Sequence, residues 1–269
     1  MAEAKNPFHW RGTVTDANCF VGRERELTSL FTRLQTLGCV SIVGERRIGK
    51  SSLLHQAWMA AQSRLGAESR PAIADLLSAR HHTLDGLLNA IMKAVTGEER
   101  PVPSGQPAAK LAAFEEAVRR ARAWGALPVA FLDEFEALGS RIEQFGDELL
   151  ESWRSLANDG QMAFVATSAR PLDEVTQESG FTSSFYNVFA QTRLEQFTEK
   201  EAKDFAQRAI RLGKLEMGDE VFIQRVGTLH PLRLQVAAWH LFEARRAGQV
   251  DYSVLQERAE SEIAGMMGK

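Results

Sequence analysis

The sequence predicts an α/β fold, with a parallel sheet covered by helices on both faces, followed by an all-helical C-terminal region. Three observations predict this class. Short apolar runs alternate with segments of helical periodicity up to residue 196, as expected of strand–helix–strand units. A glycine-rich turn joins the first apolar run to the helical segment after it. From residue 197 onward the pattern is helical only.

Five short apolar runs are predicted to form strands. They cover residues 39–43, 72–77, 129–132, 162–167 and 189–194. Helical spacing of apolar side chains predicts helices over residues 24–37, 50–65, 84–95, 108–124 and 144–157. Residues 1–19 lack periodicity and are predicted to be an extended lead-in. Residues 97–107 contain three prolines and two glycines, so we predict a mobile surface loop there.

The C-terminal region is predicted to form a separate helical domain. Thr198 and Glu201 have the spacing of a capping box, in which each side chain satisfies a free backbone N–H near the other residue. Further helices fit residues 219–226, 231–246 and 253–267, and Pro231 suits a first helical position, where its missing N–H costs nothing. We therefore predict a core domain with its lead-in over residues 1–196 and a helical lid domain over residues 197–269.

Composition and charge exclude several classes of protein. The chain has 269 residues, 44% of them hydrophobic, which excludes a disordered or low-complexity protein. Its 32 basic and 35 acidic side chains give a formal net charge of −3, which argues against wholesale non-specific binding of nucleic acid. Two cysteines cannot make a disulfide framework, and neither a secretory signal nor an apolar run of roughly 20 residues is found. We expect a cytoplasmic protein without a membrane span.

The strongest chemical signal is the pattern G-x-x-x-x-G-K-[ST] between the first predicted strand and the next helix. Its glycines let backbone N–H groups curl around phosphate oxygens, and the helix N-terminus attracts the anion. We predict that Lys50 reaches the β- and γ-phosphates and that the Ser51 hydroxyl binds Mg²⁺. This phosphate loop consists of Gly44, Glu45, Arg46, Arg47, Ile48, Gly49, Lys50 and Ser51.

Two further motifs follow later predicted strands. Asp133 and Glu134 end the strand at 129–132, at the carboxyl end where open α/β sheets bind ligands. Asp133 is predicted to hold Mg²⁺ directly or through water, and Glu134 to polarise the water that attacks the γ-phosphate. Arg170 follows the strand at 162–167 within the sequence Thr167-Ser168-Ala169-Arg170. If the two strands are neighbours, its guanidinium can contact the terminal phosphate.

Taken in order, these motifs resemble those of the STAND ATPases, which are signal-transduction ATPases with numerous domains, related to the AAA+ proteins. The resemblance runs from about residue 6 to about residue 245 and is closest to bacterial and archaeal members with short modules. Besides the motifs above, it rests on Asn6-Pro7-Phe8, on Phe20-Val21-Gly22-Arg23-Glu24 with Glu26-Leu27, on Ser52 directly after the phosphate loop, and on Gly227-Thr228-Leu229-His230-Pro231 with Leu234-Gln235.

The resemblance implies ATP or ADP with Mg²⁺ as ligands, a five-stranded parallel sheet of order 5-1-4-3-2, and a helical lid. It implies that Val21, Gly22 and Arg23 line an adenine pocket and that the segment His230-Pro231 contacts the base. Arg233, three residues past His230, is placed to reach phosphate from the lid. The residues expected to bind the cofactor are therefore Val21, Gly22, Arg23, Gly44, Glu45, Arg46, Arg47, Ile48, Gly49, Lys50, Ser51, Ser52, His230, Pro231 and Arg233.

The chain departs from the family in two respects. No convincing arginine finger follows Glu134, for which Arg154 is a poor candidate, and no winged-helix domain follows the lid. We therefore expect slow hydrolysis in the absence of a partner. The resemblance implies a nucleotide-controlled switch, for signalling or defence, whose output is assembly with a partner protein or with itself.

Two alternatives remain open at this point. One is a DNA-handling ATPase similar to Orc-type loaders or transposition regulators, which calls for a basic stripe or a winged helix. The other is a nucleotide-bound scaffold that never turns over. A small-molecule kinase fits less well, because adjacent Asp133 and Glu134 suit water activation better than acceptor binding.

Several other residues are interpreted as structural. Cys19 and Cys39 are predicted to be small core residues, and His81-His82 a surface pair without metal ligands at suitable spacing. The tryptophans within helical segments are interpreted as packing residues rather than as base-stacking groups; these are Trp58, Trp124, Trp153 and Trp239.

Overall fold

A computed structural model describes residues 5–8, 10–99 and 101–267, and its contacts divide the chain into two compact units. The sheet unit comprises residues 24–44 and 56–193. The lid unit comprises residues 45–55 together with the described parts of residues 1–23 and 194–269. In the described part of the chain, none of the helices has the length and hydropathy needed to cross a lipid bilayer.

The sheet unit is built on five parallel strands in the order β2-β3-β4-β1-β5. This is the order 5-1-4-3-2 read from the other edge, so the order implied by the family resemblance is confirmed. Because all five strands are parallel, their carboxyl ends lie at the same end of the sheet. The strands are β1 (Cys39–Val43), β2 (Ser69–Asp75), β3 (Leu127–Asp133), β4 (Ala163–Ser168) and β5 (Phe189–Arg193).

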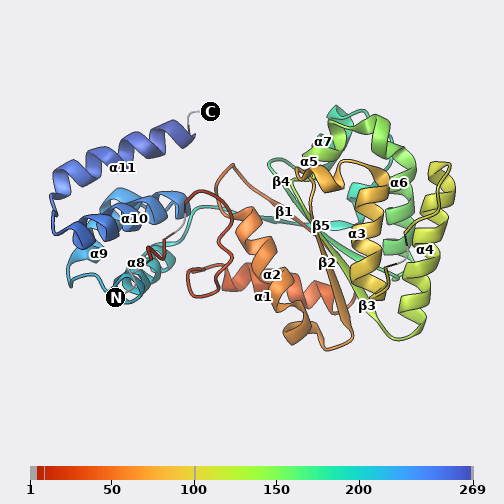
Figure 1. The fold of residues 1–269 in the computed structure, drawn as a ribbon, viewed down its shortest axis with the longest axis horizontal. Coiled ribbons are helices and arrows are strands. Elements are labelled where there is room, and N and C mark those ends of the chain that lie inside the picture. The colour runs from red at the N-terminus through yellow and green to blue at the C-terminus, as the bar shows by residue number, and fades with distance from the viewer. Residues whose placement is uncertain (1–4, 9, 100, 268–269) are drawn as a thin grey trace. The chain divides into compact units, whose positions relative to one another are not determined.

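Helices cover both faces of this sheet, as predicted for parallel strands. Helices α3, α4 and α6 lie together on one face, and α1 lies on the other (Figure 1). On the first face, Trp153 of α6 packs against Phe164 of β4 with ring centroids 5.3 Å apart. The helices are α1 (Glu24–Leu34), α3 (Leu84–Thr96), α4 (Pro107–Ala123), α5 (Glu136–Gly139), α6 (Ile142–Asn158) and α7 (Leu172–Glu178); α2 (Lys50–Leu65) begins in the lid unit and continues in the sheet unit.

Several local predictions differ from the structure. Strand β2 begins at Ser69 instead of residue 72, because an edge strand tolerates Pro71, which lacks an N–H to donate. The segment predicted as a mobile loop is anchored by Val102, whose side chain is 7% exposed and whose N–H donates to Asn89 Oδ1 at 2.7 Å. The short helices α5 and α7 were not predicted, and α6 is interrupted by non-helical backbone at Gly146.

The residues interpreted as structural agree with that interpretation in part, and two of them, His81 and Trp124, differ from it. Cys19, Cys39 and Trp153 are buried as expected. His81 is also buried, so it does not belong to a surface pair; its Nδ1 forms a hydrogen bond with the Asp75 carbonyl oxygen at 2.7 Å. Trp124 contradicts the packing interpretation, because its side chain is 76% exposed after the end of α4.

Among its described residues the lid unit contains helices α8 to α11, the start of α2 and the lead-in, defined here as residues 5–8 and 10–23. Phe8 and Trp10 of the lead-in are buried against the helices, and Trp10 meets Trp239 edge to face with ring centroids 6.2 Å apart. This packing groups the lead-in and residues 45–55 with the lid, whereas the sequence predicted residues 1–196 as one domain. The helices are α8 (Glu199–Gly213), α9 (Asp219–Gly227), α10 (Pro231–Ala247) and α11 (Tyr252–Met267).

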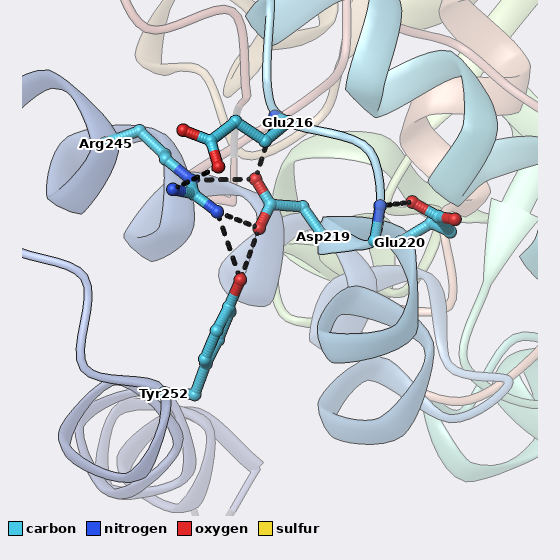
Figure 2. Close-up of polar contacts among 6 residues, drawn as sticks. Glu216, Asp219, Glu220, Arg245 and Tyr252 are labelled. Atoms are coloured by element: carbon cyan, nitrogen blue, oxygen red, sulfur yellow. Dashed lines mark hydrogen bonds and ion pairs between the residues drawn. The ribbon is translucent and has the colours of Figure 1, made fainter.

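A buried carboxylate ties α9, α10 and α11 together. Asp219 at the start of α9 is 0% exposed and accepts two hydrogen bonds from Arg245 of α10, at 2.7 and 2.9 Å. It accepts others from the Tyr252 hydroxyl of α11, at 2.7 Å, and from the Glu216 N–H, at 3.0 Å (Figure 2). Burial raises the pKa of Asp219, but these hydrogen bonds and the charge of Arg245 outweigh it and leave the pKa below its ordinary value.

Candidate functional site

The phosphate loop joins β1 to α2, as the motif predicts. Gly44 donates its N–H to the Ser168 carbonyl oxygen at 3.3 Å, which continues the pairing of β1 with β4. Two loop residues have left-handed backbone, Arg47 with φ 65° and Gly49 with φ 102°. Lys50 is 6% exposed, and its Nζ donates to the Glu45 carbonyl oxygen at 3.0 Å. The lysine is thus held over the loop at the N-terminus of α2.

This geometry fits a phosphate group. A Cβ added at Gly49 would meet nothing within 4 Å, so the space beside the loop is open at that residue. Ser51 lies in the first turn of α2, where backbone N–H groups and the helix dipole favour an anion. Ser52 does not act as a free hydroxyl, because its Oγ accepts a hydrogen bond from the Val14 N–H of the lead-in at 3.0 Å.

The lead-in motif meets both the phosphate loop and the lid within the lid unit. A Cβ at Gly22 would lie 3.1 Å from Glu201 Oε1 and 3.1 Å from the Phe197 ring, so glycine permits this close approach. Arg23 is 4% exposed, and its Nη2 donates to the carbonyl oxygens of Ile48 and Glu195. The Arg23 side chain is therefore engaged with protein carbonyls, a contact that the family resemblance did not imply.

The lid motif also faces the phosphate loop. His230 is 2% exposed and caps α10, with Nδ1 accepting the Leu232 N–H at 3.2 Å. Its Nε2 lies 3.5 Å from Glu45 Oε1. Burial lowers the pKa of His230, the Glu45 carboxylate raises it, and the nearby arginine charges of Arg233 and Arg23 lower it; the net pKa is below the ordinary value.

Arg233 and Pro231 have local structural contacts. Pro231 occupies the first position of α10, as predicted, and Arg233 Nε donates to the Val226 carbonyl oxygen of α9 at 3.2 Å. Arg233 therefore stabilises the α9–α10 turn in this structure. The guanidinium has other N–H groups that a phosphate can engage.

In the sheet unit, Thr167 holds the two acidic residues at the end of β3. Its hydroxyl donates to Asp133 Oδ1 at 2.5 Å and accepts the Glu134 N–H at 2.9 Å. Glu134 has a left-handed φ of 56°, which is uncommon for a residue with a side chain and turns the chain sharply after the strand. The sequence named Thr167 within a motif but did not predict that it bridges Asp133 and Glu134.

Arg170 lies just after β4, as predicted, and forms a bidentate ion pair with Glu178 of α7. This hydrogen bond and the Glu178 charge raise the pKa of Arg170. The preceding residue, Ala169, donates its N–H to the Glu136 carboxylate. Arg154, the candidate finger, is exposed on α6. The strand order does make β3 and β4 neighbours, which was the condition for placing Arg170 near Asp133.

Comparison with known proteins identifies the fold and a family. Residues 11–254 match the family model described as Novel STAND NTPase 1. The structure is similar to the Walker-type ATPase of Pyrococcus abyssi, with TM-score 0.68 and 16% identity over 96% of this chain and 76% of that one. None of the curated proteins matches the chain.

Two proteins of Aeropyrum pernix are also similar in structure. The ORC2 protein in its ADPNP-ADP complexes has TM-score 0.68 and 18% identity over 93% of this chain and 72% of that one. The ORC1 protein in complex with DNA has TM-score 0.63 and 18% identity over 91% of this chain and 66% of that one. At these identities the similarity establishes a fold, that of P-loop ATPases with a C-terminal helical region.

Proposed function

The chain belongs to the Novel STAND NTPase 1 family, and on this premise we propose that it is an ATP-binding switch ATPase that hydrolyses slowly and controls assembly with a partner protein or with itself. Lys50 binds the β- and γ-phosphates, and Arg170 contacts the γ-phosphate once it leaves Glu178. The Ser51 hydroxyl and the Asp133 carboxylate are oxygen ligands of the kind that Mg²⁺ prefers. When bound, the ion neutralises charge on the phosphates.

Glu134 is the general base in this proposal. Its N–H is held by Thr167, and its left-handed backbone sets the direction in which the side chain leaves the strand end. From there the carboxylate orients a water molecule and accepts its proton. Slow hydrolysis is supported by the pairing of Arg170 with Glu178, which keeps this guanidinium from the γ-phosphate until the pair opens.

The observation that carries the switch proposal is the composition of the lid unit. Residues 45–55, the lead-in and the lid helices form one compact unit, and Glu45 of the phosphate loop lies 3.5 Å from His230 of the lid. A nucleotide held by the loop therefore lies beside lid residues. Each nucleotide shifts the conformational equilibrium of the lid by the difference between its binding free energies for the two lid conformations, so ATP and ADP shift it differently when they contact the lid differently.

Mass photometry with Mg-ATP, with Mg-ADP and without nucleotide tests the proposal, alone and with candidate partner proteins. We expect the assembled fraction to differ between ATP and ADP, and phosphate release to be slow. Lys50→Ala should abolish nucleotide binding, whereas Lys110→Ala removes a lysine that pairs with Asp85 in the sheet unit and should leave binding intact. Absence of binding heat with Mg-ATP for the wild type would refute the proposal. Binding without any phosphate release would favour a scaffold.

A DNA-handling ATPase is the second candidate, supported by the similarity to the Aeropyrum pernix ORC1 protein in complex with DNA. The net charge of −3 weighs against it. Binding to a duplex that weakens steeply as salt rises would favour this function, because each phosphate contact releases counterions. Absence of binding at low salt would exclude it.

A further inference from the structure

Arg23 is buried where three segments of the lid unit meet. Its backbone has a left-handed φ of 69°, and its charged side chain is only 4% exposed. Burying a charge is costly unless it is hydrogen bonded. Here Nη2 donates to the Glu195 carbonyl oxygen at 2.6 Å and to the Ile48 carbonyl oxygen at 3.3 Å, and the guanidinium lies 4.8 Å from the Phe197 ring centroid.

The contact with Ile48 bears on the geometry of the phosphate loop. The Ile48–Gly49 peptide is trans and planar, so the Ile48 carbonyl oxygen and the Gly49 N–H point in opposite directions. A donor that holds the oxygen therefore determines where the N–H points. Gly49 itself does little to fix the orientation of this peptide. Glycine has no side chain to pack, it accepts many backbone conformations, and the space beside it is open.

The contact with Glu195 connects the same guanidinium to the lid. Glu195 lies in the segment that connects β5 to α8. The backbone N–H of Arg23 donates to Glu201 Oε1 of α8 at 3.1 Å. Oε2 of the same carboxylate closes the α8 capping box on the Thr198 N–H at 2.8 Å. A movement of α8 therefore displaces Glu201, which holds the backbone of Arg23, and pulls on the connecting segment whose Glu195 carbonyl holds the Arg23 side chain.

From these contacts we infer that Arg23 is a positioning residue: it orients the Gly49 N–H for a phosphate oxygen and makes that orientation depend on the position of the lid. The nucleotide part of this inference rests on the proposed function. The role differs from an adenine contact, because the guanidinium is directed at two protein carbonyls. The chemistry that it serves is the binding of a nucleoside diphosphate or triphosphate.

The experiment compares Arg23→Met, Arg23→Lys and the control Arg245→Met. The control breaks an ion pair in the same unit without touching the phosphate loop. Two quantities are measured: the ¹H–¹⁵N resonance of the Gly49 amide without nucleotide, and the affinities for Mg-ATP and Mg-ADP by calorimetry. Arg23→Met should shift the Gly49 resonance and weaken both affinities about tenfold, as expected for one misdirected charge-stabilising donor.

Arg23→Lys should shift the resonance less than Arg23→Met, because its ammonium can still donate to a carbonyl oxygen, but it should not restore the wild-type position, because it lacks the planar fork of the guanidinium. Arg245→Met should leave the Gly49 resonance and both affinities unchanged, even if it lowers the melting temperature as much as Arg23→Met does. A Gly49 resonance unmoved in both Arg23 variants, or moved equally by Arg245→Met, overturns the inference. A shifted resonance in a protein whose wild type binds no Mg-ATP supports the positioning contact and refutes the proposed function.

Discussion

Replacing Arg245 by methionine should destabilise the lid unit by removing the main partner of a buried carboxylate. Asp219 is 0% exposed, and Arg245 supplies two of its hydrogen bonds, at 2.7 and 2.9 Å. Breaking a buried ion pair by removing one partner costs about 3–5 kcal/mol, because the remaining charge is uncompensated. Tyr252 and the Glu216 N–H still donate to Asp219. We therefore expect about 2–3 kcal/mol.

Urea denaturation with hydrogen exchange of amides in α9 and α10 measures this cost in the lid unit itself. The matched control is Arg246→Met, which removes the neighbouring arginine and its exposed pair with Glu243. Such a surface pair contributes about 0–1 kcal/mol. The reasoning is refuted if Arg245→Met costs no more than Arg246→Met.

The pH dependence gives a second check on the same residue. In the wild type the pKa of Asp219 lies below its ordinary value. The stability that the ionised group contributes is therefore present above the unfolded pKa and is lost as pH falls through the folded pKa. Without Arg245, burial should raise the pKa above the unfolded value, so that protonation favours the folded state. The cost of Arg245→Met should then shrink as pH falls from 7 toward 4.

Three further predictions concern the candidate site. Glu134→Gln should bind Mg-ATP normally but release no phosphate, because an amide cannot accept a proton from water; wild-type turnover would contradict the assigned role. Arg170→Ala should lower the ratio of ATP affinity to ADP affinity measured by calorimetry. Glu178→Ala should raise this ratio, because it frees the Arg170 guanidinium, and an unchanged ratio in both variants would reject the sensor role. Burial lowers the pKa of His230, so its contribution to stability should be full above about pH 6.5 and fall below it. His230→Asn keeps an acceptor for the Leu232 N–H and should make the free energy of unfolding depend less on pH between pH 7 and 5. The same pH dependence in wild type and variant would contradict this reasoning.

Local elements with strong sequence patterns were predicted closely. The strand at 39–43 and the helix at 50–65 have the predicted bounds, because a β-branched run, flanking glycines and the phosphate-loop motif are all contiguous in sequence. The short helices α5 and α7 escaped prediction, since four to seven residues carry too little periodicity and such helices depend on tertiary packing. The break of α6 at Gly146 was missed for a related reason, as an isolated glycine is tolerated within a helical pattern.

The sequence by itself determined which residues are proposed to bind phosphate and metal, because these motifs depend on residue type and short spacing. Only the tertiary structure decided what holds them in place. Thr167 reaches Asp133 across 34 residues, and Arg23 reaches Ile48 and Glu195 across 25 and 172 residues. Periodicity reports which face of an element is buried but not which distant segment covers it. Hydrogen bonds between distant segments exist only after strand order and helix packing bring the two groups within about 3 Å.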